Sequence, residues 1–457
     1  MPSSESMVTT PRTGAKTMSL CAGRELARVL GVRDLVLLII GTVIGSGIFL
    51  VPGLILAAVG NSLWLALCVW LLGGMLSLLG ALTYGELSAV NPQAGGLYVY
   101  IRDCFGRFPA FLFGWTLFLV VSTGSVATLA VAFSNYLGEF VPLAAWGLKL
   151  VSFSMIGVIA AVNVIGTRRS ADLQNFSTVV KVFGIVAIAV LLLVFGKGAN
   201  FHTGNAGTAI PLSSLLPGIG IAVVSVLWAY EGWQYATFAA GEARNPGRDF
   251  PMAFLAGISV LAAVYILANL GYVRALGPAG VAKSNRVAAT AIAEVFSPAA
   301  AKVVTLVILI SIFSAANSVV LTGSRVFYAM ARDGVFFRRL GEIHPRFATP
   351  AFAVGGMAGW AAVLAATGTF EQLLTYVVFV GWAFYALGAA SIFVYRKRSN
   401  GDPSRYRVPG YPWTPLVFIA TVAAIVMNTI LAQPVRAAIG IGMVLTGAPA
   451  YFIWRKV

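Results

Sequence analysis

A run of small residues interrupts the first apolar segment of the chain. The sequence holds no charged residue between Asp34 and Glu86, and Gly45-Ser46-Gly47 falls near the middle of the first half of that stretch. Glycine is a poor helix former and permits a break in the backbone. At a break, the helix that follows exposes free N–H groups, and the helix that precedes exposes free carbonyls. A broken helix therefore offers sites for an anion and for a cation, and a free α-amino acid carries both.

We predict that the backbone around this break binds the two charged ends of such a ligand. Gly45 and Gly47 would let the ligand approach the main chain, and the Ser46 hydroxyl would add one hydrogen bond. Val43 and Ile44, just before the break, belong to the same predicted site. The alternative is a close contact between packed helices, because small residues often mediate helix crossings in membranes.

A second interruption lies within a later apolar segment, at residues 228–233. We predict that Trp228, Ala229, Glu231 and Gly232 complete the substrate site and that Trp228 closes over the substrate as a gate. Packing or an interfacial position is the alternative for Trp228. An acid within the membrane is expensive and functional by default. Glu231 could contact a cationic group, carry a proton or satisfy freed backbone groups, and the sequence does not rank these roles.

Lys181 is the other charge deep within an apolar segment. A lysine at that depth must face the interior of the helix bundle. Its ammonium could bond the carbonyls freed in the first broken helix and so substitute for a Na⁺ ion, with Ser314 and Asn317 nearby. A proton switch is a second possible role, and a lysine that snorkels to the membrane surface is the alternative to both.

Helices that cross a membrane must position these residues. The chain has 457 residues, 59% of them hydrophobic and only 10% charged, whereas soluble domains hold about 25% charged residues. One crossing needs about 20 apolar residues. The sequence therefore predicts an all-α integral membrane protein with about twelve transmembrane helices. The expected spans are approximately 35–58, 62–90, 109–137, 147–166, 173–195, 214–241, 250–273, 300–330, 350–367, 372–395, 413–432 and 435–454.

The basic residues predict the orientation and the partners. Most of the 31 Lys and Arg residues lie in alternate connections between the expected spans, as is typical of cytoplasmic loops. We therefore predict a multi-pass protein of the cell (inner or plasma) membrane with both termini in the cytoplasm. The net charge of +16 is not gathered on one face, so the lipid bilayer is the expected partner and nucleic acid is not.

Other functional classes find little support in the sequence. The three cysteines, Cys21, Cys68 and Cys104, have no spacing that indicates a metal site or a disulfide. We expect no catalytic residues, no metal and no cofactor. A membrane-embedded enzyme would need a cluster of titratable groups, and only Lys181 and Glu231 lie deep in apolar segments. A channel would be expected to show a repeated pore motif, and none is evident.

The two interruptions lie five expected spans apart, which predicts two inverted repeats of five helices. We accordingly divide the chain into a cytoplasmic tail at 1–33, a transport core of ten helices at 34–396, and two additional helices at 397–457. Within the core, the predicted repeats are 34–196 and 211–396.

Several segments resemble a known family. The first broken segment resembles the first-span signature of the amino acid–polyamine–organocation superfamily. Residues 228–234 and 241–246 resemble span 6 and the following loop of its L-type amino acid transporter branch. The other segments resemble the family's first intracellular loop and its span 8–9 region, in the same order along the chain. The segments are Gly41-Thr42-Val43-Ile44-Gly45-Ser46-Gly47-Ile48-Phe49, Gly95-Gly96-Leu97-Tyr98-Val99-Tyr100, Trp228-Ala229-Tyr230-Glu231-Gly232-Trp233-Gln234, Gly241-Glu242-Ala243-Arg244-Asn245-Pro246, Ser324-Arg325, Ala331-Arg332-Asp333-Gly334 and His344-Pro345.

The resemblance implies a LeuT-type fold, with helices 1 and 6 broken, that works by alternating access. It implies Na⁺-independent transport of L-amino acids, neutral ones above all, by an exchanger or facilitator. The substrate carboxylate would lie at Ser46 and Gly47 and its ammonium at carbonyls near Val43, Trp228 and Glu231, with Lys181 in place of a cation. Proton-coupled transport is one alternative, and a cationic amino acid or polyamine substrate is another; a channel or an enzyme is more remote.

The same resemblance bears on subunit composition. Animal L-type transporters often bond to a glycoprotein partner through a cysteine between the third and fourth spans. In this chain the segment 137–149 contains no cysteine. A disulfide-linked heavy subunit is therefore not expected.

Overall fold

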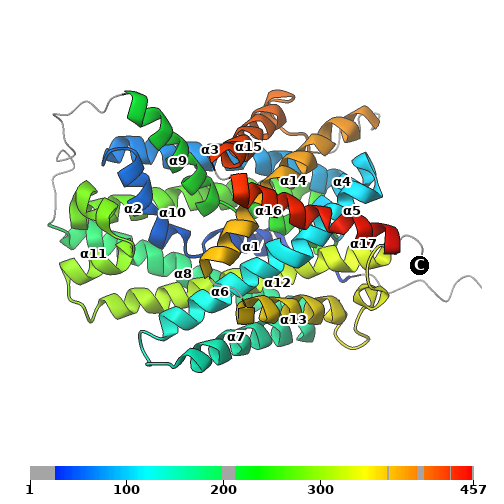
Figure 1. Cartoon of the computed structure of the whole chain (residues 1–457), viewed down its shortest axis with the longest axis horizontal. Helices are drawn as coiled ribbons and strands as arrows, with labels where there is room; N and C mark the ends of the chain where they lie inside the picture. The colour runs from blue at the N-terminus through cyan, green and yellow to red at the C-terminus, as the bar shows by residue number, and fades with distance from the viewer. Residues whose placement is uncertain (1–25, 198–211, 368–369, 399–405, 433, 455–457) are drawn as a thin grey trace, which may run out of the picture.

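Long apolar runs with few charges fold into a bundle of helices (Figure 1). The computed structural model describes residues 26–197, 212–367, 370–398, 406–432 and 434–454. In this part of the chain nearly every residue is helical or lies in a short connection, and the only strand pairing is one isolated bridge between Leu30 and Ala243. The predicted all-α membrane fold is confirmed.

The elements follow one another with short connections. In chain order they are α1 (Val32–Val43), α2 (Gly47–Ala58), α3 (Leu63–Val90), α4 (Leu97–Phe105), α5 (Arg107–Thr116), the π-helix η1 (Leu117–Val121), α6 (Ser122–Leu137), α7 (Ala145–Ile165), α8 (Thr167–Phe195), α9 (Leu212–Ala229), the 3₁₀ helix η2 (Trp233–Glu242), α10 (Pro246–Lys283), α11 (Val287–Val295), α12 (Ala301–Arg332), the 3₁₀ helix η3 (Arg338–Gly341), α13 (Ala351–Thr367), α14 (Phe370–Arg398), α15 (Trp413–Ala432), α16 (Pro434–Leu445) and α17 (Gly447–Trp454).

Each predicted span coincides with a helix or an interrupted helix. Within the described residues, eight helices are long and apolar enough to cross a membrane, and the bent pair α1–α2 raises this number to nine. The chain is therefore a multi-pass membrane protein. The number twelve stays a prediction, because these helices account for at most nine crossings and α13 is shorter than a full span. The division into a tail, two repeats and two additional helices also stays a prediction, and residues 1–25 of the tail lie outside the described residues.

Two interruptions shape the centre of the bundle. Helices α1 and α2 are bent by 53° relative to one another, with Ile44, Gly45 and Ser46 between them. Helix α9 ends at Ala229, and the chain continues as η2 rather than as an α-helix. Gly232, which begins that turn, has φ 125°, a conformation that residues with a Cβ rarely adopt. In Figure 1, α1 and α12 lie near the middle of the bundle, and α7 and α13 lie at one edge.

Two charged pairs tie together the motifs that the sequence singled out. The Arg325 guanidinium bonds both carboxylate oxygens of Glu242, at 2.9 and 3.0 Å, and both side chains are fully buried. Thr167 lies between them, donating to Glu242 and accepting from Arg325, each at 2.9 Å. The Arg102 guanidinium bonds the Asp333 carboxylate at 2.8 and 3.0 Å. These pairs connect α8, η2, α12 and α4 through side chains that are far apart in the sequence.

Candidate functional site

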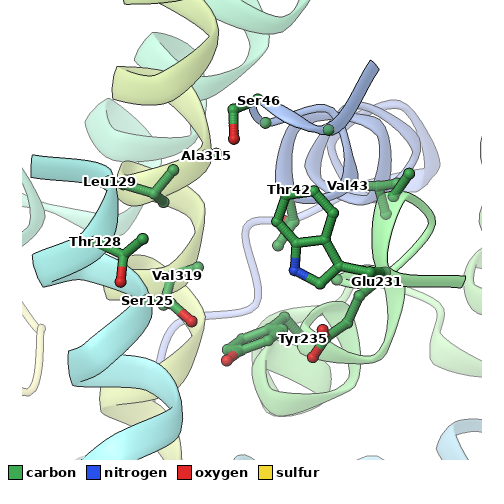
Figure 2. Close-up of a pocket in the computed structure, with 15 residues that line it drawn as sticks. Thr42, Val43, Ser46, Ser125, Thr128, Leu129, Glu231, Tyr235, Ala315 and Val319 are labelled. Carbon is green, nitrogen blue, oxygen red and sulfur yellow. The ribbon is translucent and has the colours of Figure 1, made fainter. Parts of the chain in front are cut away.

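A cavity of about 110 Å³ opens between the two interruptions. Figure 2 shows Thr42, Val43, Glu231 and Tyr235 on one side of it and side chains from α6 on the other. The residues that line it are Thr42, Val43, Gly45, Ser46, Gly47, Ser125, Thr128, Leu129, Trp228, Ala229, Glu231, Gly232, Tyr235, Ala315 and Val319. The residues predicted to bind the substrate therefore share this one cavity, except Ile44, which lies outside its lining.

The start of α2 presents unused backbone donors to the cavity. Gly45 donates to the Val43 carbonyl at 2.9 Å, but in the described part of the chain the amides of Ser46, Gly47 and Ile48 donate to no backbone carbonyl. The first amides of a helix lack partners within the helix, and its dipole makes that end favourable for an anion. A side chain built on Gly45 would meet nothing within 4 Å, so this glycine borders open space.

Gly47 has a different surrounding from Gly45. A Cβ at Gly47 would lie 3.2 Å from both the Cα and the Cβ of Ala229 and 3.5 Å from the ring of Trp228. The absence of a side chain at Gly47 therefore allows the start of α2 to pack closely against the end of α9. This close approach brings the two interruptions to the same cavity.

The carbonyls freed at the end of α1 are held by groups from two other helices. The fully buried Lys181 ammonium donates to the carbonyls of Gly41 and Ile44, at 2.7 Å each. The Ser311 hydroxyl lies 3.1 Å from the Ile44 carbonyl and 3.0 Å from the Gly45 carbonyl. Ile44 thus takes part through a carbonyl that faces Lys181 and Ser311 rather than the cavity.

The two residues predicted near Lys181 have other partners. Ser314 accepts from the Gln174 amide at 2.9 Å, and Asn317 donates to the Gln174 carbonyl oxygen at 3.1 Å. Both belong to a buried polar cluster between α8 and α12. Ser311, one turn closer to the first interruption, is the α12 residue that shares a carbonyl with Lys181. Ser311 was not identified from the sequence.

The second interruption is held by neutral groups. The Tyr265 hydroxyl donates to the Ala229 carbonyl at 2.9 Å, and the Gly232 amide donates to the Gln234 side chain at 3.2 Å. The Glu231 carboxylate accepts from the Tyr385 hydroxyl at 3.0 Å. Trp228, one residue before the end of α9, is only partly buried and lines the cavity.

The opposite wall comes from α6 and α12, and the sequence analysis missed it. Ser125, Thr128 and Leu129 lie on α6, while Ala315 and Val319 lie on α12. The π-helix η1 immediately precedes α6, and an inserted residue of this kind rotates the following face of the helix. Four small or polar residues at 122–125, within an otherwise apolar span, were the one sequence signal for this wall.

Comparison with known proteins agrees with this architecture. The model of a family described as amino acid permease matches residues 30–453. The chain is 31% identical to the serine/threonine exchanger SteT of Bacillus subtilis over 94% of this chain and 98% of that protein. It is 31% identical to the b(0,+)-type amino acid transporter 1 of Mus musculus, over 90% and 84% of the two chains. It is 30% identical to the large neutral amino acids transporter small subunit 2 of the same species, over 96% and 83%.

Proposed function

The chain belongs to the amino acid permease family, and we propose that it is a Na⁺-independent transporter of neutral L-amino acids that works by alternating access. The family and the relatives are transporters and not enzymes, which supports transport as the activity. The observation that carries the proposal is the cavity between two broken helices, with unused amides on one side and a buried lysine behind it.

In this proposal the substrate carboxylate binds at the start of α2. The amides of Ser46, Gly47 and Ile48 are available there, and Gly45 leaves the space open. The ammonium binds on the side of the Val43 and Trp228 carbonyls, where the two interruptions meet. Both groups are common to every α-amino acid, so this part of the site selects the class and not the side chain.

Lys181 supplies the positive charge that a bound Na⁺ would otherwise supply. Its ammonium already bonds the carbonyls that α1 exposes at the break. A buried charge in a membrane protein must be partnered, and these carbonyls are its partners. We therefore expect transport to proceed without Na⁺. Proton-coupled transport remains the alternative mechanism, because a lysine that released its proton during the cycle would act as a proton switch.

The proposal extends to exchange, orientation and subunit composition. We propose exchange or facilitated diffusion across the cell membrane, with both termini in the cytoplasm as the distribution of Lys and Arg indicates. The relatives are named for different substrates, so the family alone leaves the side chain open. A single subunit is proposed, because the segment 137–149 offers no cysteine for a covalent partner.

Uptake of radiolabelled amino acids into proteoliposomes tests this function. We expect uptake that persists when choline replaces Na⁺ and that rises when the vesicles are preloaded with unlabelled amino acid. A proton gradient, imposed in either direction, separates exchange from proton coupling. Strict dependence on Na⁺ would refute the role of Lys181, and the absence of uptake of any amino acid would refute the proposed activity.

A further inference from the structure

The end of the cavity opposite Ser46 is polar. Figure 2 shows Glu231, Tyr235 and Ser125 at this end, and all three line the cavity. The Ser125 hydroxyl and the Glu231 carboxylate both lie close enough to the Tyr235 hydroxyl to interact with it. We call these three residues the polar end. Because the substrate carboxylate is placed at the amides of Ser46 to Ile48, its side chain would extend in this direction.

The hydrogen bonds within the polar end leave one acceptor free. One carboxylate oxygen of Glu231 accepts from Tyr385 at 3.0 Å, and no protein group among the described residues donates to the other oxygen. Tyr235 accepts from Ser122 at 3.4 Å, and the Ser125 hydroxyl is a second partner of the same phenol group. Ser125 donates to the Val121 carbonyl at 2.6 Å and so contributes only lone pairs. A carboxylate oxygen without a protein donor and a phenol hydroxyl therefore face the same space.

We propose that the polar end binds the substrate's side chain and selects small amino acids that carry a hydroxyl group, such as serine and threonine. This inference rests on the proposed function. A hydroxyl donates one hydrogen bond and accepts others, so it can donate to Glu231 and accept from Tyr235 at once. An ammonium cannot accept from Tyr235, and a carboxylate cannot donate to Glu231 and is repelled by its charge.

The size and the remaining walls favour a short side chain. The cavity is small, at about 110 Å³. The wall beside the polar end is formed by Leu129, Ala315 and Val319, which are apolar and suit a methyl group. Serine and threonine match these features better than lysine and arginine, whose side chains are longer.

Competition against labelled alanine in proteoliposomes tests the inference, because serine–alanine and threonine–valine pairs differ mainly by the hydroxyl. A hydrogen bond to a charged group is worth roughly tenfold in affinity or more. We expect wild-type protein to prefer serine to alanine and threonine to valine about tenfold, and to bind aspartate poorly. In Glu231→Gln, which keeps the size and removes the charge, the serine preference should fall to about threefold or less, and aspartate should compete better.

The matched control is Glu294→Gln, an exposed glutamate on α11, which should leave the serine-to-alanine ratio unchanged. Tyr235→Phe provides a second variant and should also lower the ratio while leaving alanine uptake measurable. A Glu231→Gln protein that transports alanine with an unchanged ratio would overturn the inference, as would a wild-type preference for lysine or ornithine over serine. In those cases the proposed amino acid transport still stands, whereas protein that takes up no amino acid overturns both.

Discussion

The two broken helices meet at one cavity, but they hold their freed backbone groups in different ways. At the α1–α2 break a fully buried ammonium and a hydroxyl together bond the carbonyls of Gly41, Ile44 and Gly45. At the α9–η2 break, among the described residues, the carbonyl of Ala229 accepts from the neutral hydroxyl of Tyr265 and from no charged side chain. The first break is therefore fixed by a charge and the second by neutral hydrogen bonds.

The difference suggests separate roles for the two breaks. Hydrogen bonds to charged groups contribute about twice as much as neutral ones, so the first break is the more firmly positioned. Its amides are proposed to bind the part of the substrate that never varies. The second break carries Trp228, Glu231 and the turn at Gly232, which face the cavity with few partners. We infer that it adapts to the substrate and closes over it.

Filling the space at the first break should have the largest effect. We expect Gly45→Leu to abolish uptake, because its side chain would occupy the position proposed for the substrate carboxylate, while no protein atom lies within 4 Å to cause misfolding. Gly47→Leu should abolish uptake too, but it would also press on Ala229. Gly157→Leu, at a glycine with equally open surroundings on α7, is the control and should transport normally. Uptake by a well-expressed Gly45→Leu protein would place the substrate elsewhere.

Removing the charge that holds the first break should come next. Lys181→Ala leaves the carbonyls of Gly41 and Ile44 without their donor, and each lost charged hydrogen bond costs about 1.5–3 kcal/mol. We expect transport to fall by about 100-fold or more. Uptake by this variant is compared with that of Lys149→Ala, which removes an exposed lysine on α7. Full activity of Lys181→Ala would make the two breaks alike and would remove the lysine from the mechanism.

The sequence predicted the breaks better than the surfaces around them. Glycines amid apolar residues identify the first break, and a carboxylate with a glycine identifies the second, because such residues are rare in membrane helices. Lys181 stood out for the same reason. The sequence did not single out Ser125, Tyr235 and Ser311, because a single polar residue in an apolar helix does not reveal which face it occupies. Ser314 and Asn317 were expected near Lys181, but Ser311, three residues and about 4.5 Å of helix rise before Ser314, shares the Ile44 carbonyl with it.

Trp228 tests whether the second break closes over the substrate. Trp228→Ala removes the partly buried ring over the cavity, and closing such a cover sequesters the ligand and commits the cycle. We expect apparent affinity or turnover to fall by about tenfold, with Trp228→Phe retaining most of the activity. Initial rates over a range of substrate concentrations separate the two effects. Unchanged kinetics for Trp228→Ala would assign the residue to packing.

The smallest effect is expected where a neutral group holds the second break. Tyr265→Phe keeps the ring, which packs between Trp70 and Tyr230 with centroids 5.1 and 5.0 Å away, and removes only the hydroxyl that donates to the Ala229 carbonyl. A neutral hydrogen bond contributes about 1 kcal/mol, so we expect a loss of about fivefold in transport.

Ser311→Ala is the matched change at the first break, because it also removes one neutral hydroxyl. Its effect should be similarly small, since Lys181 still bonds the Ile44 carbonyl. Initial uptake rates of both variants, normalised to the amount of folded protein in the membrane, provide the measurement. If Tyr265→Phe lost as much activity as Lys181→Ala, a neutral hydroxyl would matter as much as the buried charge. The contrast between the two breaks would then be wrong.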